Sequence, residues 1–113
     1  MSVKTTIAAI PLTTFNSASV TASYQPINSG GLNFSCILLR VNNASNAAIT
    51  ISYDGVTDHE YIQAAGLLEI QAQANSLPSP NACCFKRGTI IYLKGTAGVG
   101  TIALSGYYQP QGG

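Results

Sequence analysis

Apolar and polar side chains alternate with a period of two along much of this 113-residue chain. In the clearest segment, Ile49, Ile51 and Tyr53 fall on one side of an extended backbone. Thr50 and Ser52 fall on the other side, which is therefore hydroxylated. No window of eleven or more residues repeats apolar positions with the i, i+3, i+4, i+7 spacing of an amphipathic helix. The pattern predicts an all-β fold.

Turn-forming residues divide the middle of the chain into short strands. Residues 33–41 and 48–53 are expected to form a hairpin across a turn at 42–46. A second hairpin is expected between 48–53 and 59–63, across the Asp-Gly-containing turn at 54–58. Both hairpins are inferred from local signals alone.

Outside this region the signals are proline and glycine. Pro78 and Pro80 favour one long loop at 73–82, because proline cannot donate to a sheet. Glycines at 95–100 predict a turn between strands at 89–94 and 101–109. Near the N-terminus, apolar and polar residues alternate over 13–24, which favours extended structure, and the pattern breaks at 25–31.

About seven to eight short strands with near-regular turns predict an antiparallel β-sandwich or jelly roll. The length suits one domain, residues 1–113. We expect a short N-terminal arm and a flexible C-terminal tail from about residue 109.

Charge is scarce, and this restricts the partners. Only 8% of residues are Asp, Glu, Lys or Arg, against roughly 25% in an ordinary domain. The net charge is +1 and the five basic residues are scattered, so no nucleic-acid partner is expected. The apolar stretches are far shorter than the ~20 residues of a membrane span, and no membrane partner is expected either. So neutral a surface suits a subunit held against other subunits.

The three cysteines do not form a recognisable framework. Cys83 and Cys84 are adjacent and Cys36 is distant, with no CxxC pair for zinc. We interpret them as reduced, mostly buried side chains, which implies synthesis in a reducing compartment such as the cytoplasm.

No catalytic motif accompanies the only histidine, His59, so the chain is predicted not to be an enzyme and to need no cofactor. Asp54, Asp58, His59 and Glu60 are the candidate ligands for a divalent ion. Because Asp-Gly is a common turn element, we favour a turn there and predict no metal site.

Three sequence pieces occur in order: a strand ending in Asn42-Asn43, the run Ser52-Tyr53-Asp54-Gly55-Val56-Thr57-Asp58-His59, and Lys94-Gly95 before a glycine turn into 101–108. In this pattern, about the last two-thirds of the chain resembles small β-sandwich structural proteins of tailed bacteriophages. Within that group the chain looks like a capsid decoration, or cement, protein.

The resemblance implies a virion location and a non-enzymatic role. A decoration protein binds the outer shell and bridges major capsid subunits. The alternative is a tail, neck or fibre-associated adaptor or host-contact protein, and a second alternative is a carbohydrate- or metal-binding module. Expected partners are the major capsid protein or other virion proteins and, as a dimer or trimer, further copies of this chain.

Loops and termini are the expected contact regions. The interface candidates are Met1, Ser2, Val3, Lys4, Ser76, Leu77, Pro78, Pro80, Tyr108, Gln109, Pro110 and Gln111.

Overall fold

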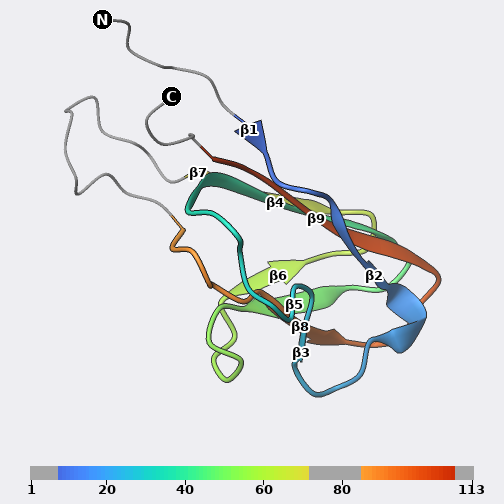
Figure 1. Ribbon diagram of the computed structural model, residues 1–113. Helices are drawn as coiled ribbons and strands as arrows, with labels where there is room; N and C mark the ends of the chain where they lie inside the picture. Colours follow the sequence, from blue (N-terminus) through green and yellow to red (C-terminus); the bar gives the residue numbers. More distant parts are fainter. Residues whose placement is uncertain (1–7, 72–84, 109–113) are drawn as a thin grey trace, which may run out of the picture.

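The computed structural model describes residues 8–71 and 85–108 (Figure 1). Residues 1–7, 72–84 and 109–113 lie outside the described ranges, and with them the predicted long loop at 73–82. The prediction of a single domain with two loose ends therefore stays a prediction.

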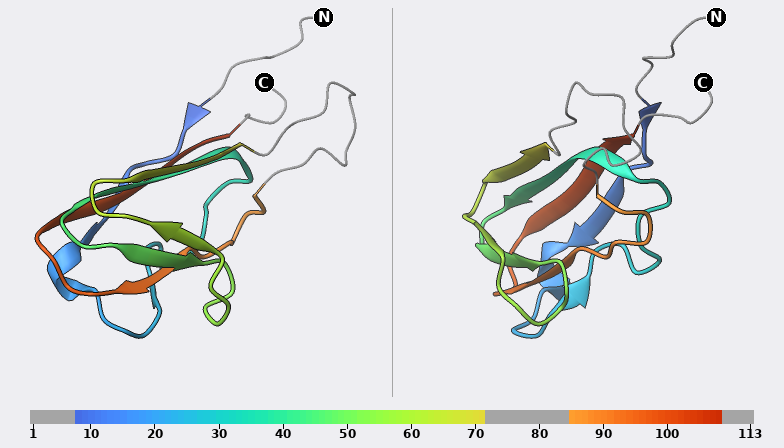
Figure 2. Two further views of the ribbon diagram at one scale, coloured as in Figure 1. Left: turned by 180° about the vertical axis from the view of Figure 1, so that it is seen from behind. Right: turned by 90° about the vertical axis from the view of Figure 1, so that its left-hand side faces the viewer.

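The described residues form two antiparallel sheets packed face to face, as Figures 1 and 2 show. Sheet A contains, in order, β1 (Ala8–Ala9), β9 (Gly100–Tyr108), β4 (Cys36–Ser45) and β7 (Leu67–Gln71), and β2 (Thr13–Asn16) also pairs with β9. Sheet B contains, in order, β3 (Gln25–Pro26), β8 (Tyr92–Gly95), β5 (Ile49–Ser52) and β6 (Glu60–Ile62). One 3-10 turn, η1 (Ser17–Ser19), follows β2. The predicted all-β sandwich is confirmed.

The apolar face predicted for the middle of the chain is the inner face of sheet B. Ile49 and Ile51 are 1% and 0% exposed, and Ile51 lies opposite Leu93 of β8. From sheet A they meet Leu39 and Leu104, which are also buried. The core is therefore one layer between the sheets, and each sheet keeps an outer face.

The predicted hairpin between β5 and β6 is confirmed, because Ile49 pairs with Ile62 and Thr50 with Tyr61. The hairpin predicted between 33–41 and 48–53 is wrong. β4 belongs to sheet A and β5 to sheet B, so the chain crosses from one sheet to the other between them.

The turn predicted at 42–46 begins later in the chain, because β4 extends through most of this segment. β4 continues to Ser45, and Asn43 is buried within it. Its side-chain amide donates to the carbonyl oxygens of Ala47 at 2.9 Å and Gln63 at 3.1 Å. A buried amide with such partners is tolerated inside a strand, so the turn comes later.

Two other boundaries differ from the sequence prediction. The strand expected over 13–24 ends at Asn16, whose Oδ1 accepts a hydrogen bond from the Ala18 N–H at 2.9 Å and caps η1. Gln25 and Pro26, placed in a breaking segment, form the short edge strand β3. The two strands predicted on either side of the glycine turn at 95–100 correspond to β8 and β9, which belong to different sheets.

No helix in the part of the chain that the structure describes is long and apolar enough to cross a membrane.

Candidate functional site

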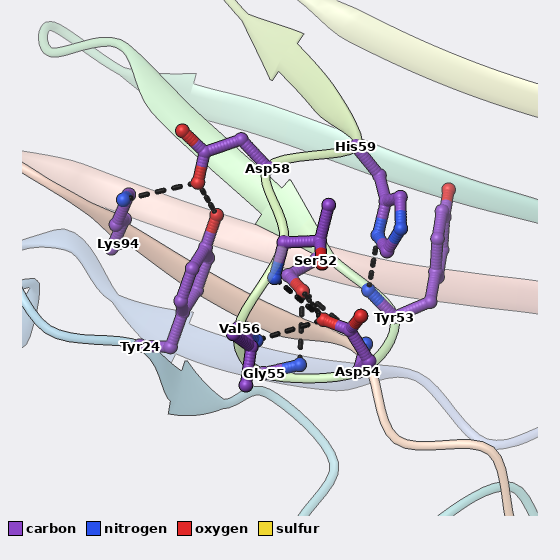
Figure 3. A network of polar contacts seen from close by, with 10 residues as sticks. Tyr24, Ser52, Tyr53, Asp54, Gly55, Val56, Asp58, His59 and Lys94 are labelled. Atoms are coloured by element: carbon purple, nitrogen blue, oxygen red, sulfur yellow. Dashed lines mark hydrogen bonds and ion pairs between the residues drawn. The ribbon is translucent and has the colours of Figure 1, made fainter.

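The loop between β5 and β6 is closed by its own hydrogen bonds (Figure 3). Ser52 Oγ accepts from the N–H groups of Asp54 (3.2 Å) and Gly55 (2.9 Å). It donates in turn to Asp54 Oδ1 at 2.8 Å. The same oxygen accepts from the N–H groups of Val56 and Thr57 at 2.8 and 2.7 Å. A short polar loop is thus held in one conformation.

The charge state of Asp54 follows from these contacts. The backbone N–H groups of Thr57 and Val56, with the Ser52 hydroxyl, hold the pKa of this carboxyl well below its usual range. Asp54 is therefore a turn-forming carboxylate, as the sequence favoured, and its Oδ1 already accepts three hydrogen bonds.

The loop also lies against the outer face of sheet B. Gly55 has φ +80°, and a Cβ there would stand 3.2 Å from the ring of Tyr92 on β8. Only glycine allows this backbone and this close approach together. The loop is thereby seated on the sheet.

Asp58 joins the loop to two side chains of other segments (Figure 3). Its Oδ1 lies 3.0 Å from Lys94 Nζ and accepts a hydrogen bond from the Tyr24 hydroxyl. Lys94 Nζ also lies 4.7 Å from the centre of the Tyr24 ring, within cation–π range. Three distant parts of the sequence meet here.

The contacts shift two ionisation equilibria. The hydrogen bond from Tyr24, followed by that from Lys94, lowers the pKa of Asp58. Loss of water around the phenol, with the hydrogen bond to Asp58, raises the pKa of Tyr24 to about 12. At neutral pH the cluster holds one carboxylate, one ammonium and a protonated phenol, so its net charge is zero.

A cross-strand row extends the cluster across sheet B. Thr50 of β5 lies between Tyr61 of β6 and Lys94 of β8, and all three project to the same outer face. Tyr61 is 70% exposed. We call this surface the tyrosine face; its residues are Tyr24, Thr50, Asp58, Tyr61, Tyr92 and Lys94. A hollow of about 290 Å³ adjoins it, lined by Tyr61, Ile62, Gln63, Gly66, Leu67 and Leu68.

Of the tyrosine face, the sequence prediction named only Asp58 as a candidate site residue. Period-two alternation puts Tyr92 and Lys94 on one face of a strand, which is a usable signal. The pairing of β8 with β5 carries no local signal, and neither does the return of Tyr24 to Asp58 across 34 positions.

The four candidate metal ligands do not converge. His59 Nδ1 accepts the Tyr53 N–H at 3.0 Å and its ring stacks on Tyr53 at 5.3 Å. Glu60 lies in β6 opposite Ile51. In residues 8–71 and 85–108, no three His, Cys, Asp or Glu side chains come together as a metal site would require.

Ser52 and His59 are not arranged as a nucleophile and its base. Ser52 is 0% exposed and its hydroxyl donates to Asp54. The imidazole nitrogen Nδ1 of His59 is occupied by a backbone N–H. Neither group of this loop is set up for proton transfer to the other.

Of the predicted interface residues, only Tyr108 lies in a described segment. Its ring stacks on Phe34, with centres 3.9 Å apart, and packs against the core. The remaining interface candidates stay predictions, since these lie outside the described residues: Met1, Ser2, Val3, Lys4, Ser76, Leu77, Pro78, Pro80, Gln109, Pro110 and Gln111.

The outer face of sheet A differs from the tyrosine face. Most of its cross-strand rows carry small or polar side chains, although Leu67, opposite Asn42, is 58% exposed, and an ion pair joins Arg40 to Glu69 at 2.6 Å. Tyr107 and Leu38 pair at one end. We call this surface the flat face; its smaller residues are Thr14, Asn16, Asn42, Ala44, Thr101, Ala103 and Ser105.

Comparison with known proteins gives a distant likeness to a solved structure. No family model matches the chain, and no curated protein matches it. Among solved structures it is similar to the Dit protein (gp 19.1) of SPP1, described as a paradigm of the hub adsorption apparatus in phages that infect Gram-positive hosts. The identity is 15% and the TM-score 0.42, over 90% of this chain and 49% of that one. The chain thus spans about half the length of that protein, and a likeness of this degree carries no argument about function.

Proposed function

We propose that this protein is a non-enzymatic structural component of a tailed-phage virion, placed in the tail, neck or fibre region as an adaptor. The observation that carries the proposal is the difference between the two outer faces of the sandwich. The flat face suits contact with other subunits, and the tyrosine face suits contact with a ligand. The phage setting is supported by the sequence resemblance described above.

The flat face has the properties of a subunit contact. No described segment covers it, and most of its side chains are short and uncharged; the larger ones are the Arg40–Glu69 pair, Leu38, Leu67 and Tyr107. Ala103, Ala44 and Thr101 allow a partner backbone to approach closely. Interfaces are depleted in unpaired charge at their centres, as this face is.

The tail-region placement is supported by the tyrosine face. A subunit that only fastens a shell does not need an exposed tyrosine, Tyr61, on the same face as a fixed carboxylate and ammonium group. An adaptor that also contacts a host surface could use such a face for binding. One face then binds the particle and the other faces outward.

Capsid decoration is the second placement. It is supported by the scarcity of charge, 8% of residues with a net charge of +1, which suits a subunit permanently packed on a neutral shell. The partner would then be the major capsid protein, bound through the flat face. Both placements make the protein part of the virion, and both allow homo-oligomers.

Electron microscopy of reconstituted particles tests the proposal. Phage particles that lack the protein are mixed with purified, gold-labelled protein. Label at the tail, neck or fibres is the expected result, label on the shell lattice supports decoration, and label at neither overturns the virion role.

Two arginine variants test the flat face. Ala103→Arg places a charge at its centre and should reduce bound label roughly tenfold, as a loss of about 1.4 kcal/mol would. Val99→Arg, at a position that is 77% exposed in the β8–β9 turn, is the control and should bind like the wild type. Equal binding by both variants contradicts the assigned contact.

A further inference from the structure

We propose that the tyrosine face is a binding site for a neutral saccharide. The inference rests on the proposed function for its biological setting and on the geometry of sheet B for its chemistry. It names the ligand class that an adaptor of this kind would meet.

The face has an aromatic side, Tyr61, and a polar side, Asp58 and Lys94, with the short side chain of Thr50 between them. We call Asp58 and Lys94 the polar wall. Neighbouring strands of a sheet lie ~4.8 Å apart, so the backbones of Tyr61 and Lys94 are roughly 10 Å apart across Thr50. Thr50 is the shortest of the three side chains. The space above it is flanked by an exposed phenol ring on one side and an ammonium group on the other.

The polar wall offers both kinds of hydrogen-bonding group. Asp58 is 61% exposed and uses Oδ1 for Tyr24 and Lys94, and no described residue donates to its Oδ2. That oxygen can accept a hydroxyl proton from a ligand. Lys94 is 31% exposed and has N–H donors beyond the one directed at Asp58. A sugar hydroxyl both donates and accepts, so this pair matches it.

The charge balance of the face selects the class of ligand. Asp58 and Lys94 neutralise each other and the nearby Asp54 is ionised, so no positive field attracts a phosphate backbone or an acidic polymer. A saccharide ring has an apolar C–H surface that stacks on an aromatic ring and a rim of hydroxyl groups. Tyr61 and the Asp58–Lys94 pair supply the complements of these two parts.

The polar wall is already fixed before any ligand arrives. Asp58 is held by the Tyr24 hydroxyl and Lys94, and the Asp54 contacts hold the loop that carries it. Binding therefore costs little ordering of these side chains. The hollow beyond Tyr61, which reaches Gln63 and Leu67, lies where a second saccharide unit would pass the edge of the sheet.

The test is an NMR titration of the ¹⁵N-labelled full chain. The probes are glucose, galactose, N-acetylglucosamine and their β-linked disaccharides, each added to tens of millimolar. We expect saturable amide shifts centred on Thr50, Tyr61 and Lys94 with at least one of these probes. No saturable shift with any probe, or shifts that map to the flat face, would overturn the site.

Variants separate this site from its surroundings. Tyr61→Ala should weaken the responding probe roughly tenfold, and Tyr61→Phe, which keeps the ring, by less than about threefold. Val56→Ala removes another exposed side chain, 81% exposed on the adjoining loop, and should bind as the wild type does. Equal affinity of Tyr61→Ala and wild type would sink the proposal. Virion placement is measured separately by microscopy, so either proposal can fail without the other.

Discussion

The side-chain amide of Asn43, on β4 of sheet A, donates a hydrogen bond to the backbone carbonyl of Gln63, just beyond β6 of sheet B, at 3.1 Å. The same amide reaches the carbonyl of Ala47 at 2.9 Å, and Asn43 Oδ1 accepts from the Ser45 hydroxyl at 2.6 Å. One buried polar group thus ties the two sheets together on the flank where the chain crosses between them.

Replacing this amide should cost stability. Asn43→Ala removes a buried amide and leaves the part-buried carbonyls of Ala47 and Gln63 without that donor, so unfolding should become easier by about 1–3 kcal/mol. Asn42→Ala, at the exposed neighbouring position of the same strand, should change stability by less than about 0.5 kcal/mol. Urea denaturation measures both, and equal midpoints for the two variants would contradict the role of Asn43.

Gly31 and Gly30 form a matched pair for backbone strain. Gly31 has φ +80°, and a Cβ there would stand 2.6 Å from the Gly88 carbonyl oxygen. Gly31→Ala should therefore lose about 1–3 kcal/mol of folding free energy. A Cβ on Gly30 meets nothing within 4 Å, and Gly30→Ala should be near neutral. If calorimetry shows the same melting temperature for both, this turn geometry is wrong.

Ile51 and Thr50 test the assignment of the two faces of β5. Ile51 is 0% exposed, so Ile51→Asp buries an unpaired charge and should cost upwards of ~4 kcal/mol, enough to unfold much of a marginally stable domain. Thr50→Asp places the same charge on the outer face beside Lys94 and should keep the fold. Circular dichroism melts distinguish the two, and an unchanged melting temperature for Ile51→Asp would refute the core assignment.

The lowered pKa of Asp54 predicts a pH effect of definite sign. Hydrogen bonds favour the ionised form of Asp54 in the folded state, and ionised Asp54 therefore contributes to folding stability. This contribution is fully present above the ordinary carboxyl pKa of about 3.9. It is lost as the pH falls below that value toward the folded-state pKa. A ¹³C carboxyl titration should find Asp54 still ionised where an ordinary carboxyl is half protonated.

Asp54→Asn is the matched variant, since its Oδ1 still accepts from Val56 and Thr57. It should preserve the loop at neutral pH while losing the acid dependence. An Asp54 that titrates at an ordinary carboxyl pKa would mean that these hydrogen bonds do not form in solution.

Tyr24 should titrate late. Its pKa is raised to about 12, partly through its hydrogen bond to Asp58, so Asp58→Asn should move it toward the ordinary ~10. Tyr53, whose pKa burial also raises to about 12, is the internal control and should not move. Ultraviolet titration of wild type, Asp58→Asn and Tyr24→Phe assigns the transition. A Tyr24 pKa that is the same with and without Asp58 would contradict the contact in Figure 3.

Local signals predicted the fold class and the β5–β6 hairpin correctly, because alternation and an Asp-Gly turn act over a few residues. Ile49 and Ile51 were placed in the core for the same reason. The partners of β4 were predicted wrongly, because its pairing with β9 depends on residues far along the chain. Burial of Asn43 was not foreseeable, since the acceptors at Ile62 and Gln63 come from β6 of the other sheet and the residue that follows it.

In the candidate site, too, local features could be predicted from the sequence and long-range contacts could not. Asp54 as a turn carboxylate follows from its neighbours, and the structure agrees. Tyr24, Asp58 and Lys94 come together because β3 pairs with β8 and the loop between β5 and β6 lies over that part of the sheet. No short window of sequence encodes this arrangement. Three charged or phenolic groups, each unremarkable alone, become a surface only after folding.

The arrangement of the strands in sheet A also affects how the protein folds during its synthesis. β4 leaves the ribosome long before β9, its central partner in sheet A, so the edge of β4 that pairs with β9 waits unpaired during synthesis, whereas β7, the partner on the other edge, follows sooner. Such long-range pairing is slow and leaves strand edges open to other chains. Sheet A can close only after β9 emerges, so a nascent chain interrupted before that strand has no native sandwich to form and is prone to aggregate.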